Sequence, residues 1–280
     1  MNEYKKIETV EMAPGIILGG EKPVLIAGPC VVESEKITLG TAEKLKEITQ
    51  RLDIPFVFKS SYDKANRTSG TTFRSIGFEE ALKLLQRVRK EFNVPVITDV
   101  HESNQVEAVA QVVDVLQIPA FLCRQTDLLI AAGKTGKAVN IKKGQFMAPE
   151  DMRYSLDKVR STGNEKVCLT ERGSSFGYHT LVVDFRSLPI MRQFAPVIFD
   201  ATHSVQMPGG AGGSSNGQRE FVAPLARAAA AVGVDGFFLE THPDPDHAPS
   251  DGANMVDIQE IEEILKPIIK IWHEVKNSSS

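Results

Sequence analysis

Short apolar runs rich in Val, Ile and Phe alternate along this chain with longer stretches in which apolar residues recur at helical spacing. Alternating strands and helices are typical of a parallel sheet, and about eight such units are what a closed barrel needs. We therefore predict an α/β fold, a (β/α)8 TIM barrel, with strands near Val24–Ala27, Phe56–Phe58, Val96–Thr98, Val115–Ile118, Ala138–Ile141, Val167–Leu169, Val197–Phe199 and Gly236–Leu239.

Between these runs the periodicity predicts helices. The last of them carries a continuous apolar stripe, which indicates core packing rather than a cofactor site. The predicted helices are Glu35–Arg51, Glu79–Phe92, Ser103–Val112, Pro149–Thr162, Gln218–Val232 and Val256–Lys276.

Ahead of the first barrel strand, a turn signal at Ala13-Pro14-Gly15 separates two further apolar segments, Lys5–Val10 and Ile16–Leu18. This pattern predicts a β-hairpin at the bottom of the barrel. We expect residues 1–22 to form this hairpin unit and residues 23–280 to form a single catalytic barrel.

Composition narrows the class of protein. The 280 residues are 42% hydrophobic and 24% charged, as in a water-soluble globular protein. The net charge of −4 argues against nucleic-acid or membrane-surface binding, which needs a basic surplus. Residues 1–12 contain no apolar stretch typical of a signal peptide or membrane span. The three cysteines, Cys30, Cys123 and Cys168, are too few for a disulfide framework, so we expect a cytoplasmic protein.

Polar residues gather where the predicted strands end, which is where barrel enzymes place their active sites. One group is basic. On an acidic protein, such a group predicts a pocket for polyanionic substrates. The alternative is that these residues are ordinary solvent-exposed charges at the edge of the barrel. The members of the group are Lys59, Lys64, Arg67, Arg124, Lys142 and Arg172.

A second group could bind a divalent metal. Closure of a barrel brings its last strand beside its first, so Cys30, His203 and Glu240 converge, and Asp251 lies within reach. These ligand types suit zinc or ferrous iron, and also cobalt or manganese. No compact spacing motif supports the site, so Cys30 and His203 could equally be buried structural residues. His101 and His242 are alternative ligands or acid–base groups.

The remaining features are less specific. The glycine-rich segment 208–217 follows the seventh strand, where an active-site lid is expected more than a domain linker. Cys168 lies within an apolar strand and indicates packing. Cys123 suggests no role.

Longer strings resemble the 3-deoxy-D-manno-octulosonate 8-phosphate synthase family, in order, from about Pro23 to the last helix. These strings are IAGPC at 26–30, FKSSYDKANRTS at 58–69, TDVHE at 98–102, QIPAFLCRQTD at 117–127, NIKKGQF at 140–146, ERGSSFG at 171–177, DATHSVQ at 200–206 and ETHPDP at 240–245.

The resemblance implies condensation of phosphoenolpyruvate with D-arabinose 5-phosphate in lipopolysaccharide biosynthesis, by a cytoplasmic homotetramer. It implies catalytic roles for Lys64, His203 and Asp251. It also places Lys59, Lys64, Lys142 and Arg172 around phosphoenolpyruvate, Asn66, Asp99 and Gln117 near the pentose, Arg67 at its phosphate, and Arg124 in a neighbouring subunit's site.

Two local differences divide the family. The sister heptulosonate 7-phosphate synthases, which use erythrose 4-phosphate, typically read Lys-Pro-Arg-Thr where this chain reads KANR at 64–67. An asparagine amide can hydrogen-bond sugar hydroxyls where proline cannot, which favours the pentose. Metal-independent members have asparagine at the position of Cys30 and Cys-Asp-Gly where this chain has Ser250-Asp251-Gly252. Both differences imply a metal-dependent enzyme with Cys30, His203, Glu240 and Asp251 as ligands.

Three alternatives stay open at this point. The first is the sister heptulosonate synthase itself. The second is a class II type metal aldolase, which explains the metal and phosphate groups but not the KANR string. The third is a sugar-phosphate sensor without activity, which would need one of the site residues to be lost, and none is missing.

Overall fold

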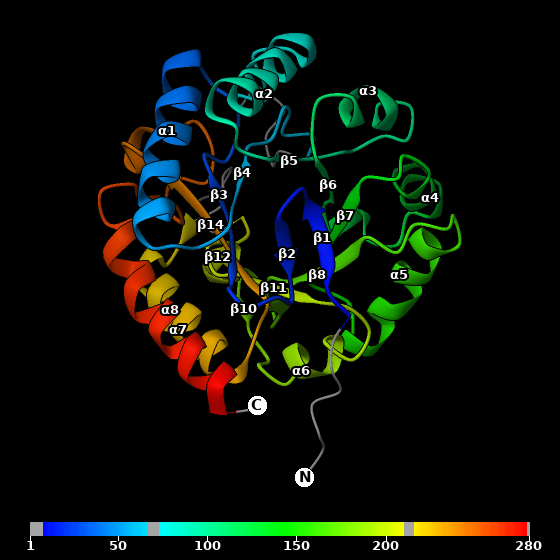
Figure 1. The fold of residues 1–280 in the computed structure, drawn as a ribbon, viewed down its shortest axis with the longest axis vertical. Helices are drawn as coiled ribbons and strands as arrows, with labels where there is room; N and C mark the ends of the chain where they lie inside the picture. Colours follow the sequence, from blue (N-terminus) through cyan, green and yellow to red (C-terminus); the bar gives the residue numbers. More distant parts are fainter. Residues whose placement is uncertain (1–7, 67–72, 210–215, 279–280) are drawn as a thin grey trace.

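The computed structural model describes residues 8–66, 73–209 and 216–278, and within these ranges eight parallel strands form a closed barrel (Figure 1). The strands follow one another around the ring in chain order, and pairing of the eighth with the first closes it. They are β3 (Val24–Gly28), β4 (Phe56–Lys59), β5 (Val96–Asp99), β6 (Val115–Ile118), β7 (Ala138–Lys142), β8 (Val167–Glu171), β11 (Val197–Asp200) and β14 (Gly236–His242). The predicted fold is confirmed.

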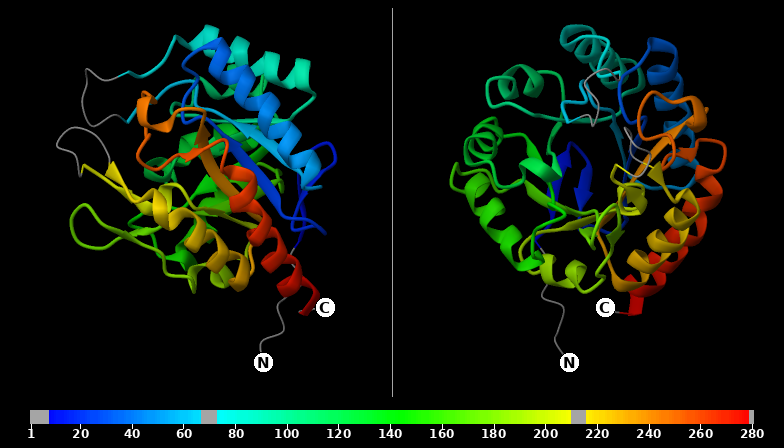
Figure 2. Two further views of the ribbon diagram at one scale, coloured as in Figure 1. Left: turned by 90° about the vertical axis from the view of Figure 1, so that its left-hand side faces the viewer. Right: turned by 180° about the vertical axis from the view of Figure 1, so that it is seen from behind.

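Helices surround the barrel on its outside, as the views from the side and from behind also show (Figure 2). None of the helices in the described part of the chain is both long and apolar enough to cross a membrane. The helices are α1 (Glu35–Arg51), α2 (Phe78–Phe92), α3 (Val106–Ala110), α4 (Thr126–Lys134), α5 (Met152–Arg160), α6 (Ser187–Met191), α7 (Val222–Val232) and α8 (Ile261–Ser278).

The loops contain further short strands and 3-10 turns. The strands are β9 (Ser174–Ser175), β10 (Leu181–Val182), β12 (Gln206–Met207), β13 (Asn216–Gly217) and β15 (Val256–Asp257). The 3-10 turns are η1 (Ala120–Leu122), η2 (Pro149–Asp151), η3 (His203–Val205), η4 (Arg219–Phe221) and η5 (Pro245–His247).

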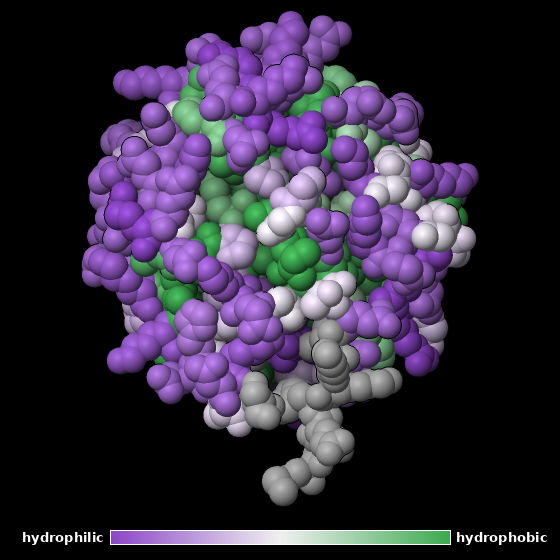
Figure 3. Space-filling view, in the orientation of Figure 1, coloured by the Kyte–Doolittle hydropathy of each residue, from purple (hydrophilic) through white to green (hydrophobic). Residues whose placement is uncertain are grey.

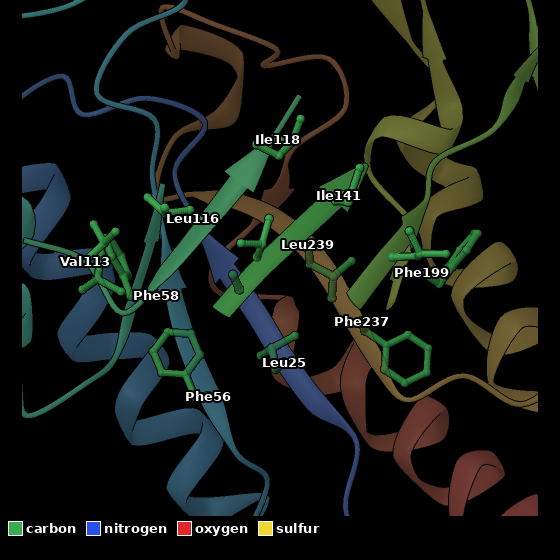
Figure 4. Packing of buried hydrophobic residues seen from close by; sticks show 14 of the residues in the cluster. Leu25, Phe56, Phe58, Val113, Leu116, Ile118, Ile141, Phe199, Phe237 and Leu239 are labelled. Atoms are coloured by element: carbon green, nitrogen blue, oxygen red, sulfur yellow. The ribbon is translucent and has the colours of Figure 1, made fainter. Parts of the chain in front are cut away.

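Alternation along each barrel strand separates two cores, because successive strand residues point to opposite faces. In β3, Leu25 and Ala27 belong to the larger apolar cluster between barrel and helices, part of which Figure 4 shows. Val24 and Ile26 belong instead to a smaller cluster inside the barrel. Cys168 packs in this inner cluster, as its apolar surroundings predicted.

The predicted hairpin lies at the amino-terminal end of the barrel, in the centre of Figure 1. It consists of β1 (Val10–Ala13) and β2 (Ile16–Leu18), joined through Gly15 at φ +78°. Its buried side chains extend the inner cluster, and the surface around it carries a small hydrophobic area in a hydrophilic face (Figure 3). The bounds predicted for the first hairpin strand, Lys5–Val10, were wrong by several residues. Residues 5–7 lie outside the described ranges, and pairing begins at Val10.

The helix predictions need three corrections. Val256–Asp257 pairs with β14 as a short strand, so the last helix begins only at Ile261. The helix predicted at Ser103–Val112 is limited to α3. The predicted starts at Pro149 and Gln218 are occupied by loop and 3-10 turns, and α4 and α6 were not predicted.

Candidate active site

The inside of the barrel changes from apolar to polar along its length. The inward positions of the lower layer hold Val57, Ile97 and Phe238. Two residues further along the same strands, and therefore on the same face, are Lys59, Asp99 and Glu240. The same register brings Gln117, Lys142 and Asp200 into this upper layer.

Above this layer, the carboxyl ends of the strands enclose a cavity of about 640 Å³. Most residues predicted for the site lie on its wall. They are Lys59, Lys64, Asn66, Asp99, Gln117, Lys142, Arg172, His203 and Asp251. Cys30 and Glu240 are each 1% exposed and lie beside the cavity, within the barrel wall.

A thiol and two carboxylates converge at one side of the cavity. One potential ligand atom from each of Cys30, Glu240 and Asp251 lies within 4.8 Å of the others. Cys30 Sγ is 3.1 Å from Asp251 Oδ2, and burial followed by the charge of Glu240 raises the pKa of the thiol. His203 is outside this compact group, but its Nε2 lies 3.7 Å from Glu240 Oε2.

Glu240 has two different oxygen environments. Lys59 Nζ donates to Oε1 at 2.7 Å, whereas Oε2 is buried without a hydrogen-bond partner. Burial alone would raise the pKa of this carboxyl, but the charges of Lys59 and His203 hold the pKa well below its usual range. An ionised, buried oxygen without a donor fits a cation beside the thiol and imidazole.

Asp200 organises the neighbouring part of the site. Its Oδ2 accepts hydrogen bonds from Lys142 Nζ at 2.5 Å and from His203 Nδ1 at 2.8 Å. Its Oδ1 accepts from the backbone N–H of His203 at 2.9 Å. Despite burial, the charges of His203 and Lys142 hold the Asp200 pKa well below its usual range. His203 therefore keeps Nε2 directed toward Glu240.

The cationic side of the cavity is built from buried side chains. Lys142 and Arg172 are each 5% exposed, and burial lowers the pKa of both. Lys142 Nζ lies 3.7 Å from the centroid of the Phe238 ring, which forms the apolar floor. Arg172 Nη1 is buried without a hydrogen-bond partner, so the site retains a donor for an anion.

Lys64 lies on the wall of the cavity beside the thiol and carboxylates. Burial would lower its pKa, but the charges of Cys30 and Glu240, with smaller contributions from Asp99 and Asp251, raise the pKa above its usual value. Lys64 is therefore a cation at neutral pH.

Asp99 ends β5, which is two strands from β3 around the ring. Ser61 Oγ donates to Asp99 Oδ1 at 2.5 Å, and His101 Nε2 is 2.8 Å from Oδ2. Burial opposes ionisation, but the hydrogen bond and charge of His101 keep the Asp99 pKa well below its usual range. His101 thus contacts a carboxylate rather than the group of Cys30, Glu240 and Asp251. His242 Nε2 lies 2.8 Å from Glu33 Oε1.

Of the predicted site residues that the structure describes, Arg124 is exposed and is not on the cavity wall. Arg67 lies outside the described residues. Of the predicted lid, Pro208 and Gly209 line the cavity and Asn216–Gly217 pair with β12, whereas residues 210–215 fall outside the described ranges.

Sequence reasoning did not assign roles to Asp200 or Gln206. Asp200 could have been found from its position, since it stands two residues after the inward Ile198 at the end of β11. Gln206 contacts both Arg172 and Asp251, but it follows a turn and no strand register points to it. Cys123 is buried in the larger apolar cluster, beside Gly144.

Comparison with known proteins gives concordant matches. Residues 5–277 match the DAHP synthetase I family. Over 274 residues the chain is 58% identical to the 2-dehydro-3-deoxyphosphooctonate aldolase of Koribacter versatilis, covering 97% of this chain and 96% of that protein. It is 56% identical to the protein of the same name from Syntrophotalea carbinolica, covering 97% and 99%. This chain belongs to the DAHP synthetase I family.

Proposed function

We propose that this enzyme condenses phosphoenolpyruvate with D-arabinose 5-phosphate and water, giving 3-deoxy-D-manno-octulosonate 8-phosphate and inorganic phosphate for lipopolysaccharide biosynthesis. The observation that carries the proposal is a cavity lined by buried cations beside a thiol–carboxylate group, in a chain 56–59% identical to several 2-dehydro-3-deoxyphosphooctonate aldolases. In the reaction, C3 of phosphoenolpyruvate attacks the aldehyde, water adds at C2, and phosphate leaves by C–O cleavage.

Phosphoenolpyruvate would bind in the deepest part of the cavity. Lys142 and Arg172 offer fixed positive charge there, and the unpartnered Nη1 of Arg172 is a donor in need of an anionic acceptor. Lys59 and Lys64 complete this cationic wall. Held in this way, the enolpyruvate would present C3 toward the mouth, and the lysines would stabilise the charge that develops on its oxygens.

The pentose would lie nearer the mouth. Asn66 is exposed on the cavity wall, and its amide can both donate to and accept from sugar hydroxyls. Asp99 and Gln117 lie on the inner wall below it. The pKa of Asp99 is low, so its carboxylate can accept a hydroxyl hydrogen bond at neutral pH. Arg67 would hold the sugar phosphate.

Cys30, His203, Glu240 and Asp251 would hold a divalent metal, zinc, ferrous iron, manganese or cobalt. The lone oxygen Oε2 of Glu240 and the thiol 3.1 Å from Asp251 support this assignment. A metal at this position would supply a positive charge that orients water or polarises the aldehyde. Of the chain's own groups, Lys64, His203 and Asp251 line the same cavity and would hold or transfer the protons of the reaction.

We also propose a homotetramer in the cytoplasm, with Arg124 completing a neighbouring site. Exposed aromatic side chains beside Arg124 support a contact surface: Phe121 is 54% and Phe146 59% exposed. The three free cysteines fit a reducing compartment. Sedimentation of the purified protein would measure the assembly, and Arg124→Ala should lower activity without separating the subunits.

A phosphate-release assay with two aldoses tests the reaction. We expect faster release from phosphoenolpyruvate with D-arabinose 5-phosphate than with erythrose 4-phosphate. The opposite preference would make the chain a heptulosonate synthase, and release with neither aldose would refute the condensation.

Chelation tests the metal separately. Metal-depleted enzyme should lose activity and recover it when manganese, cobalt, zinc or ferrous iron is added. Full turnover in metal-free buffer would refute the metal. In Cys30→Asn, activity that no longer needs metal would indicate that the metal orients groups rather than supplying the chemistry alone.

A further inference from the structure

Gln206 lies between the two halves of the site. Its side-chain oxygen accepts a hydrogen bond from Arg172 Nη2 at 2.9 Å, and its side-chain nitrogen donates to Asp251 Oδ1 at 3.1 Å. The guanidinium of Arg172 has donors only and Asp251 Oδ1 is an acceptor, so an amide in this orientation satisfies both partners. Gln206 therefore joins the anion-binding wall to the thiol–carboxylate group.

On one side, Gln206 determines which oxygen of Asp251 faces the thiol. Oδ1 is occupied by the Gln206 amide, while Oδ2 lies 3.1 Å from Cys30 Sγ. Asp251 also has a left-handed backbone, with φ of +51°, which a residue other than glycine keeps only when its surroundings hold it. The amide is one of those surroundings.

On the other side, Gln206 determines which nitrogen of Arg172 is free. Nη2 is used by the amide oxygen, and Nη1 remains buried without a partner. The guanidinium is rigid and planar, so fixing one of its nitrogens fixes the direction of the other. Gln206 thus holds one polar atom of Arg172 and one of Asp251. The other atom of each pair, Arg172 Nη1 and Asp251 Oδ2, remains available to the site.

The backbone of Gln206 is itself well fixed. It pairs with Gly217 in the two-stranded sheet β12–β13, and the N–H of Gln218 donates to the carbonyl of Val205. A side chain at Gly217 would overlap Asn254, which shows how closely β13 approaches the loop that carries Asp251. The amide is therefore presented from a supported strand.

We infer that Gln206 is a positioning residue that couples the metal site to the phosphoenolpyruvate site, which rests on the function proposed above. Because the amide contacts both side chains, phosphoenolpyruvate that fixes Arg172 would also fix Asp251 in place for the metal. Because coupling between two sites is reciprocal, each ligand strengthens binding of the other by the same factor.

Three variants separate the two contacts. Gln206→Met has similar volume but neither polar atom. Gln206→Glu keeps the acceptor toward Arg172 and loses the donor toward Asp251. Gln111→Met, at the exposed residue that follows α3, changes the same residue type outside the site and serves as a matched control.

The measurement is titration of metal-free protein with Co²⁺, with and without phosphoenolpyruvate and without the aldose. The charge-transfer absorption of a cobalt–thiolate bond reports binding independently of turnover. We expect Gln206→Met to bind Co²⁺ about 10- to 100-fold more weakly, the usual effect of removing a partner of a metal ligand. Phosphoenolpyruvate should tighten Co²⁺ binding in the wild type and in Gln111→Met, but not in either Gln206 variant.

Two results would overturn the inference. Equal Co²⁺ affinity and equal coupling in the wild type and both Gln206 variants would refute it while leaving the proposed function intact. Absence of the absorption in the wild type, matching a Cys30→Ser control, would refute the inference and the proposed metal site, while the phosphate-release assay would still decide the condensation. Far-UV circular dichroism verifies folding, and Gln206→Glu, which is isosteric, carries the test if Gln206→Met does not fold.

Discussion

Replacing Asp200 by asparagine tests how strongly one buried carboxylate organises the site. Asp200 is fully buried and accepts hydrogen bonds on both oxygens, from Lys142 and His203 on Oδ2 and from the His203 backbone on Oδ1. An asparagine has the same shape, but its NH₂ group must face a donor whichever way the amide is turned. It also leaves the buried Lys142 cation without its counter-ion.

Breaking a buried ion pair by removing one partner costs about 3–5 kcal/mol. Such a loss is a large part of the roughly 5–15 kcal/mol that stabilises a typical protein. With a urea dependence of about 3 kcal/mol per M, the unfolding midpoint should fall by about 1 M or more. Asp157→Asn, at an exposed position on α5, should change stability by less than about 0.5 kcal/mol.

Urea unfolding of metal-free protein at pH 7, followed by circular dichroism and by fluorescence of Trp272, the single tryptophan, gives the measurement. Burial already lowers the pKa of Lys142, and the charge of Asp200 opposes that effect. Without Asp200 the folded-state pKa of Lys142 falls further below its unfolded value. The unfolded chain then binds more protons, so stability rises with pH and the deficit of the variant shrinks between pH 7 and pH 9.5.

Stability of Asp200→Asn within about 1 kcal/mol of the wild type at pH 7 would refute the reasoning, since one buried pair alone should exceed that value. A deficit that grows rather than shrinks with rising pH would contradict the role assigned to Lys142.

Two further predictions concern the framework of the site. Gly28→Ala would place a methyl group against the backbone carbonyl of Lys59. Overpacking of this kind costs about 1–3 kcal/mol, so we expect a lower Tm. An unchanged Tm would show that β3 and β4 can separate freely. Tyr62→Phe removes a hydroxyl that donates to Gln105 at 2.7 Å and contacts His101. We expect the free energy of unfolding, measured by thermal unfolding, to fall by about 1–2 kcal/mol. Wild-type stability would show that this hydrogen bond contributes nothing.

The barrel could be predicted because its signal is local and repeated. Each strand is an apolar run, and most runs reach a polar residue on the inward face, as Val57 and Lys59 illustrate. The elements that prediction missed are those in which tertiary contacts outweigh periodicity. Val256 lies in an apolar pattern of helical spacing, but it pairs with Thr241 as a strand residue. The five residues of α3 are too few to show a helical period.

The site was predictable to the extent that strand order determines proximity. Cys30 and Glu240 were expected to meet because the first and last strands pair, and they do. The partners of those residues were not predictable. Gln206 reaches Asp251 across 45 positions of sequence, through a turn whose direction no strand register determines. The register places Asp200 on the inward face, but its role follows only from its contacts with Lys142 and His203.

The hairpin at the amino-terminal end has a kinetic consequence. Its apolar side chains fill that end of the barrel, so the cavity opens where the strands finish, at the other end. Lys142 and Arg172 are 5% exposed at its depth, whereas Asn66 is exposed near its rim. If phosphoenolpyruvate binds near Lys142 and the aldose near Asn66, as proposed, both substrates use the same opening at different depths. We therefore expect phosphoenolpyruvate to bind first and the bound aldose to separate it from solvent.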